Sequence, residues 1–120
     1  MNDTMTADEF NALKAKPKPK YGNQKTEVDG VMFDSKAEAK RYKELKHLLD
    51  EGEIQSLILQ PKYPIVVYGE KICTYIGDFR YRFFGSDVEI VEDVKGVRTP
   101  SYRLKKKLMR AVHGIDIVEV

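Results

Sequence analysis

The sequence predicts a mixed α/β fold of the α+β kind, in which helices flank a mixed β-sheet. Apolar residues recur at helical spacing in residues 35–50 and again in residues 101–112. Between these helices lie extended segments rich in Val, Ile, Tyr and Phe, joined by short turns. A final apolar segment, residues 115–120, follows the second helix, and such a helical crossover places two strands parallel.

The chain is expected to begin with a basic arm and a hairpin. Residues 1–24 form the arm, which we expect to be partly disordered, and residues 25–120 form one domain. In the arm, the run Lys16-Pro17-Lys18-Pro19-Lys20 stops any helix, because each proline pushes the preceding residue into an extended conformation. Asp29-Gly30 then lies between two short apolar segments, a pattern typical of a two-residue hairpin turn.

The first helix begins at Asp34-Ser35, runs to about Asp50 and stops at Gly52. Its expected apolar stripe consists of Ala37, Ala39, Tyr42, Leu45, Leu48 and Leu49.

Three antiparallel strands are expected to follow this helix. The first spans residues 54–68 and is interrupted at Pro61. The second is a single long strand over residues 71–84, and the third runs over residues 88–95. The second helix opens at Thr99-Pro100-Ser101 and stops at Gly114, before the last strand.

Composition limits the class of protein. With 120 residues, 42% of them hydrophobic, the chain can bury one core. The single cysteine, Cys73, excludes an intramolecular disulfide and makes a cysteine-based zinc site implausible. No apolar run approaches the roughly 18 residues that a membrane helix needs, so we expect no membrane partner and a cytoplasmic location.

Charge is segregated although the formal net charge is only +2. Residues 14–25 and 95–115 contain lysine and arginine but no acid, whereas the first helix mixes both signs. Such segregation produces a local positive field that a polyanion would experience.

Two acids stand out because each lies near the end of a mostly apolar strand. Asp93 and Lys95 are two residues apart and share one face of their strand, and Asp78 lies on the neighbouring strand. Two carboxylates can bind Mg²⁺ while a lysine orients a water molecule. The alternative is structural: Asp78 pairs with Arg80 or Lys95 in a salt bridge.

Glu38 has two interpretations. In Ser35-Lys36-Ala37-Glu38 it completes a capping box, with Ser35 as the N-cap. It also lies in the first turn of a helix packed on the sheet, from which it could supply a third carboxylate to the same site.

The order of these elements, with Asp78 on the second strand and Asp93-Val94-Lys95 on the third, resembles the PD-(D/E)XK nuclease superfamily, which has a restriction-endonuclease-like core. A small phage-encoded family of unknown function is a closer resemblance over roughly residues 20–120. The stretches that resemble it are Lys20-Tyr21-Gly22-Asn23, Glu27-Val28-Asp29-Gly30, Phe33 to Ala39, Leu59-Gln60-Pro61 and Glu92 to Gly96.

The resemblance implies that Asp78 and Asp93 bind Mg²⁺, with Mn²⁺ as a substitute, and that Lys95 positions the attacking water. It also favours Glu38 as a further catalytic and metal-binding residue. Gly77 stands where the superfamily often has proline. Glu92 is a competing acid, but its strand phase opposes that of Lys95.

Contacts to nucleic acid are expected mainly on the second helix. If this helix buries Leu104, Leu108 and Val112, it turns a basic face outward. The candidate contacts are Gln60, Arg98, Tyr102, Arg103, Lys106, Lys107 and Arg110. The alternatives are a solvated basic face, a strand-end amide for Gln60 and simple packing for Tyr102.

The sequence thus predicts a Mg²⁺-dependent DNA endonuclease, with branched or recombining DNA in phage replication as a substrate suggested by junction resolvases of similar size. A homodimer is an open alternative to a monomer. A non-catalytic DNA-binding or assembly module and an RNA-processing nuclease are the competing functions.

Overall fold

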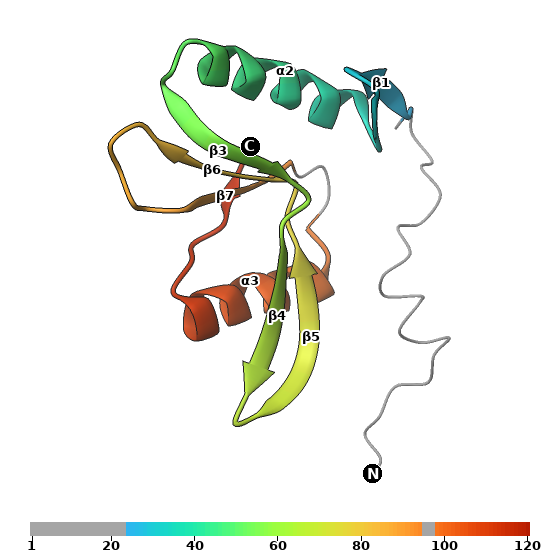
Figure 1. The fold of residues 1–120 in the computed structure, drawn as a ribbon. Helices are drawn as coiled ribbons and strands as arrows, with labels where there is room; N and C mark the ends of the chain where they lie inside the picture. The colour runs from blue at the N-terminus through green and yellow to red at the C-terminus, as the bar shows by residue number, and fades with distance from the viewer. Residues whose placement is uncertain (1–23, 95–97) are drawn as a thin grey trace.

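The structure is a computed structural model that describes residues 24–94 and 98–120, so the expected basic arm, apart from residue 24, lies outside the described residues. A four-stranded sheet in the order β3-β6-β7-β8 forms the centre, with α2 on one face and α3 on the other (Figure 1). Two further two-stranded sheets, β1-β2 and β4-β5, flank it. The predicted mixed α/β fold is confirmed.

The hairpin and the first helix form where the sequence predicts them. Strands β1 (Thr26–Val28) and β2 (Val31–Phe33) pair around Asp29-Gly30, and both turn residues have positive φ. Helix α2 (Lys36–Asp50) is capped by the Ser35 side chain. Ala37 is exposed, and Glu38 replaces it among the buried residues of the helix.

The central sheet has the predicted mixed topology. Strands β3 (Ile54–Leu59), β6 (Phe79–Phe83) and β7 (Ile90–Asp93) pair antiparallel in that order, and β8 (Val118–Glu119) pairs parallel to β7. The helical crossover through α3 therefore returns the chain beside β7, as a crossover between parallel strands requires.

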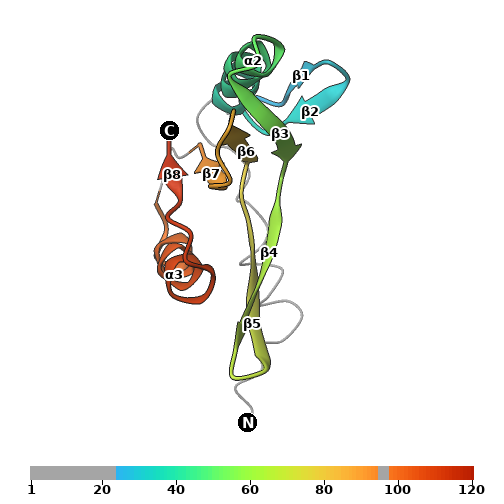
Figure 2. The same cartoon turned by 60° about the vertical axis from the view of Figure 1, so that its left-hand side comes forward.

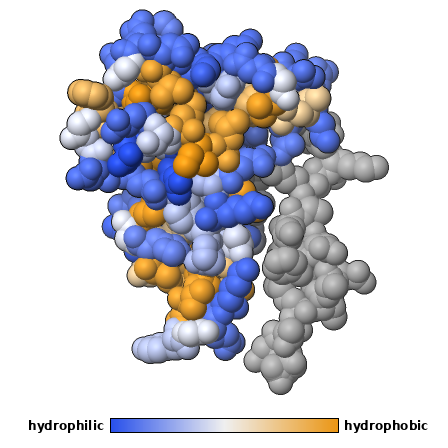
Figure 3. All heavy atoms as spheres, in the orientation of Figure 1, coloured by the Kyte–Doolittle hydropathy of each residue, from blue (hydrophilic) through white to orange (hydrophobic). Residues whose placement is uncertain are grey.

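The single long strand predicted over residues 71–84 is wrong. It divides into β5 (Glu70–Ile76) and β6. Strand β5 pairs with β4 (Lys62–Val67) in a two-stranded ribbon, called the β4–β5 arm below, that projects from the sheet (Figure 2). On the arm, Val66 and Ile72 are 42% and 53% exposed, and apolar surface is visible near its tip in Figure 3.

The division has a local physical cause at Pro61 and Gly77. Pro61 cannot donate a ladder hydrogen bond, and Gln60 before it has a φ of 50°. The Gly77 N–H donates to the Pro61 carbonyl at 3.0 Å, and the Gln60 N–H donates to the Asp78 carbonyl at 3.0 Å. Both strands of the ribbon therefore bend at the same level, and Asp78 lies at the bend.

The second helix comprises α3 (Pro100–Leu108) and a π-helical turn, η1 (Met109–His113). Its predicted buried face is partly wrong, because Leu104 is 58% exposed. Tyr102 and Met109 are the buried residues instead, and Leu108 and Val112 pack beside them. Gly114 ends the helix with a φ of 68°, as predicted.

The sheet separates two apolar cores. Under α2 lie Phe33, Ala39, Tyr42, Leu45, Ile54, Phe79 and Tyr81. Under α3 and the inner face of the arm lie Tyr63, Ile65, Tyr75, Val91, Tyr102, Met109 and Ile117. The arm is thus a structural part of the second core. In the part of the chain that the structure describes, no helix is long and apolar enough to cross a membrane.

We expect Gly77→Ala to destabilise the fold by about 1–3 kcal/mol, because the site is already tightly packed. A Cβ at this position would lie 3.1 Å from Val91 Cγ1 and 3.4 Å from Pro61 Cγ. Urea denaturation of Gly77→Ala, Val91→Ala and the double variant measures the effect. The double variant should lose less than the sum of the single losses, because Val91→Ala makes room for the new methyl group. Strictly additive losses would contradict the steric explanation.

Candidate functional site

The bend in the ribbon brings Asp78 to Asp93. The two side chains are hydrogen-bonded to each other, and Asp78 Oδ2 also accepts a hydrogen bond from the Val94 N–H at 2.7 Å. Asp93 is 3% exposed, and its Oδ2 accepts a hydrogen bond from the Tyr75 hydroxyl at 2.5 Å. Two carboxylates from neighbouring strands thus face each other, with a backbone amide and a phenol fixing their orientation.

Glu38 lies beside this pair. It is 8% exposed, and its charge contributes to the raised pKa of Asp78. Ser35 Oγ accepts the Glu38 N–H at 3.1 Å, so the helix is capped as predicted while the Glu38 side chain is buried near the aspartates.

A hollow of about 120 Å³ lies beside Glu38 and Asp78. Its polar wall is formed by Glu38, Gln60 and Asp78, and its apolar wall by Val31, Met32, Phe33, Leu59 and Phe79. The structure therefore brings together Glu38, Gln60, Asp78 and Asp93, which come from α2, the end of β3, the bend and β7.

Crowding raises the pKa of Asp78 to about 8. Burial is the largest cause, followed by the charge and hydrogen bond of Asp93 and the charge of Glu38, while the Val94 amide opposes the shift. Burial and the Asp93 charge also raise the pKa of Tyr75, which keeps its hydroxyl a donor. At neutral pH the aspartate pair therefore holds a proton between two carboxylates.

Hard oxygen donors with a shared proton fit a divalent cation, since a metal ion can take the place of a proton on its ligands. Among the described residues, no three histidine, cysteine, aspartate or glutamate side chains are grouped as a ready metal site. Mg²⁺ commonly takes only one or two protein carboxylates and completes its shell with water. The Asp78–Asp93 pair is a donor set of that size.

Glu92 is excluded from this site by its orientation. It is 1% exposed and faces α2, where Arg41 Nε and Nη2 donate to its two carboxylate oxygens at 2.8 and 2.6 Å. The Tyr81 hydroxyl donates to Glu92 as well. Glu92 and its neighbour Asp93 face opposite sides of β7, and Glu92 is part of a buried structural ion pair.

Lys95 lies outside the described residues, so its catalytic role stays a prediction.

The predicted basic face is largely engaged in internal contacts. Arg98 Nε and Lys106 Nζ lie 2.9 and 3.2 Å from the Glu119 carboxylate. Tyr102 is 7% exposed and donates its hydroxyl to Glu119 at 2.7 Å, which favours the packing alternative for this residue. Arg110 pairs with Asp116 at 3.2 Å. Arg103 and Lys107 are exposed on the outer side of α3.

The sequence interpretation missed Tyr75 and Glu119. Strand alternation alone would put Tyr75 on the face opposite Asp78, and Tyr75 reaches Asp93 because the ribbon bends at Gly77. Glu119 stands beside Asp93 in the parallel register of β7 and β8, a pairing that only the fold creates.

Residues 18–114 match the model of a family described as protein of unknown function (DUF1064). The chain belongs to this family. A comparison with curated proteins finds no match. The match to a family of unknown function agrees with the sequence analysis. The description of the family names no activity, so a relation to the nuclease superfamily stays a prediction. In this member the family region covers the bend, the aspartate pair and all of α3.

We expect Arg41→Ala to lower the free energy of unfolding by about 3–5 kcal/mol, because it leaves Glu92 buried without its counter-charge. Adding Glu92→Gln should recover part of the loss, since a neutral amide needs no counter-ion. Glu44→Ala, which removes only the exposed partner of Arg41, should change stability by less than about 1 kcal/mol. Urea denaturation measures all three, and equal losses for Arg41→Ala and Glu44→Ala would contradict the assignment.

Glu119 should contribute to acid stability. Hydrogen bonds from Tyr102 and Arg98 hold its pKa at about 2, below the ordinary 4.5. A depressed pKa stabilises the folded state fully above about pH 4.5 and loses this effect as the pH falls towards 2. We therefore expect the melting temperatures of wild type and Glu119→Gln to differ most at pH 7, to draw closer below about pH 4.5 and to converge only near pH 2. Glu70→Gln, at the exposed arm tip, is the control. A difference that persists unchanged at pH 3 would refute this account.

Proposed function

We propose that this protein is a metal-dependent DNA endonuclease that hydrolyses phosphodiester bonds in the cytoplasm of a host cell. The facing pair Asp78 and Asp93, with Glu38 beside it, carries the proposal. Two carboxylates brought together from neighbouring strands are costly when both are ionised, so they either hold a proton or bind a cation. Their placement also agrees with the resemblance of the sequence to PD-(D/E)XK nucleases.

Each residue has a specific part in the proposed reaction. Asp78 and Asp93, assisted by Glu38, would hold Mg²⁺, or Mn²⁺ in its place. Such an ion, when bound, polarises the scissile phosphate and stabilises the leaving oxygen. Lys95 would orient the attacking water. Tyr75 and the Val94 amide are positioning groups, since they donate hydrogen bonds to the carboxylates at 2.5 and 2.7 Å.

Gln60 has a supporting position. It lines the same hollow as Glu38 and Asp78, and its amide could donate to a phosphate oxygen there.

Branched or recombining DNA in phage replication is the substrate we propose to test first, beside plain duplex and single strands.

The decisive experiment is cleavage of labelled duplex, single-stranded, flap and four-way-junction DNA, and of RNA, with Mg²⁺ or Mn²⁺. We expect wild type to cleave at least one DNA substrate and Asp78→Asn and Lys95→Ala to lose at least about a hundredfold in rate. Asp50→Asn and Lys43→Ala, with the same charge changes on exposed residues of α2, should cleave like wild type. Equal rates for all variants would disprove the mechanism, whereas cleavage of RNA alone would indicate an RNA-processing nuclease.

Metal binding gives a readout independent of cleavage. A ligand that binds only the folded state raises its stability, by about 2.7 kcal/mol at a hundred times its dissociation constant. We expect Mn²⁺ to raise the melting temperature of wild type and of Asp50→Asn but not of Asp78→Asn. An equal rise in all three proteins would place the metal elsewhere. Nucleic-acid binding without cleavage or metal stabilisation would support the non-catalytic module instead.

A further inference from the structure

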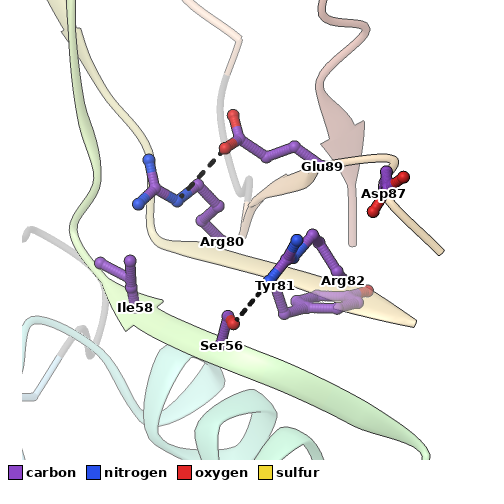
Figure 4. A pocket seen from close by; sticks show the side chains of 7 residues that line it. All are labelled: Ser56, Ile58, Arg80, Tyr81, Arg82, Asp87 and Glu89. Atoms are coloured by element: carbon purple, nitrogen blue, oxygen red, sulfur yellow. Dashed lines mark hydrogen bonds and ion pairs between the residues drawn. The ribbon is translucent and has the colours of Figure 1, made fainter. Parts of the chain in front are cut away.

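A second, larger hollow lies on the face of the central sheet that points away from α2 (Figure 4). Its volume is about 330 Å³. It is lined by Ser56 and Ile58 of β3, Arg80 and Arg82 of β6, and Asp87 and Glu89 before β7. These residues do not belong to the carboxylate site described above.

The two arginines of this hollow have hydrogen-bonding capacity to spare. Arg82 Nη2 donates to Ser56 Oγ at 3.0 Å, and no carboxylate of the described residues pairs with it. Arg80 Nη1 lies 3.5 Å from the Tyr63 hydroxyl, and Arg80 Nε lies 3.5 Å from Glu89 Oε1. Both contacts of Arg80 are at the outer limit of a hydrogen bond. A guanidinium carries five N–H donors in a planar fork that matches a phosphate.

The arginines and Asp93 lie on the same side of the sheet, and Asp78 stands at the bend, where it also lines the hollow beside Glu38. Phe79 and Tyr81 point into the core under α2, so the alternating residues 80 and 82 point to the opposite face. Arg80 stands opposite Val91 in the register of β6 and β7, and Asp93 follows Val91 by two residues. Helix α3 covers Val91, whereas the hollow beside Arg80 and Arg82 is lined by residues of β3, β6 and the segment before β7.

The distance along β6 suits a nucleic-acid strand. A strand rises about 3.3 Å per residue, so the Cα atoms of Arg80 and Arg82 lie roughly 7 and 13 Å from that of Asp78. One strand of DNA advances about 3.4 Å per nucleotide along the helix axis. The arginines are therefore about two to four nucleotides from the carboxylate pair.

We propose that Arg80 and Arg82 form a phosphate-binding site for the substrate strand, about two to four nucleotides from the bond that is cut. This inference rests on the proposed function, because it takes the aspartate pair as the position of the scissile phosphate. The contact reads no bases, and it positions the strand across β6.

The two acids of the hollow oppose this binding. Glu89 is held by the Tyr63 hydroxyl at 2.6 Å and provides a counter-charge for Arg80 in the free protein. Asp87 is exposed at the rim. Removing the charge of Asp87 should therefore strengthen binding, in the opposite direction to removing an arginine.

The test is fluorescence anisotropy of labelled four-way-junction and duplex DNA with the full chain carrying Asp78→Asn, in Ca²⁺ and at several KCl concentrations. We expect Arg82→Ala to weaken binding roughly tenfold at low salt and to reduce the slope of log affinity against log salt by about 0.9, the loss of one phosphate contact. Lys43→Ala, an equal charge change on α2, should stay within about twofold of its parent. Asp87→Asn should bind more tightly than its control Asp50→Asn. The melting temperature of each variant confirms its folding.

The outcomes separate the two proposals. Equal affinity and salt slope for Arg82→Ala and Lys43→Ala would overturn the phosphate site, even if cleavage depends on Asp78. No binding of any DNA by the parent would overturn the phosphate site too, and the cleavage assay would then decide the hydrolysis on its own. A selective loss in Arg82→Ala without any cleavage would retain the phosphate site and overturn the hydrolysis.

Discussion

The ladder of hydrogen bonds between the two long segments cannot continue straight past Pro61 and Gly77, and the rest of the structure depends on that bend. Pro61 has no N–H to donate, and a Cβ on Gly77 would lie 3.1 Å from Val91 Cγ1. The ribbon therefore leaves the sheet as the β4–β5 arm, whose inner residues Tyr63 and Tyr75 form a core with α3. The same bend places Asp78 opposite Asp93, so the fold and the candidate site have one cause.

Alternation along β7 turns two neighbouring acids to opposite faces of the sheet. Glu92 points towards α2 and receives two hydrogen bonds from Arg41 and one from Tyr81, which compensates its burial. Asp93, the next residue, points to the other face and meets a second carboxylate. A protein selected only for stability would avoid the arrangement of Asp93, because like charges in a poorly solvated place oppose folding. The contrast between these neighbours supports a binding role for the pair.

Local sequence signals predicted the elements well where one short-range rule decides the structure. Asp29-Gly30, the Ser35 cap and the crossover to β8 are of this kind, and all three are confirmed. The break inside residues 71–84 was missed because the apolar pattern runs through Gly77 without a change of period, and the cause lies sixteen residues earlier, at Pro61. The predicted buried face of the second helix included Leu104. Tyr102 and Met109 fill the core under α3 instead, and Leu104 is exposed.

The sequence identified the carboxylates of the candidate site, but not the side chains that contact them. Asp78, Asp93 and Glu38 were found because acids are conspicuous in apolar strands and at helix starts. The hydrogen bond from Tyr75 depends on the bend, so no spacing along the chain reveals it. Arg80 was considered only as a salt-bridge partner of Asp78, and it lies nearest Glu89 instead.

Glu119 changes where a polyanion would be attracted. One carboxylate on β8 draws Arg98 and Lys106 towards itself, although the segment around α3 contains no acid of its own. The cations of that helix therefore contribute less field at the surface than their number suggests, because a paired charge is largely cancelled at a distance. Arg82 lies outside this acid-free segment. Among the described side chains, its only hydrogen-bond partner is the Ser56 hydroxyl. Arg82, with unused donors on the sheet face, can therefore contact a phosphate backbone that the partly paired cations around α3 attract less strongly than their number suggests.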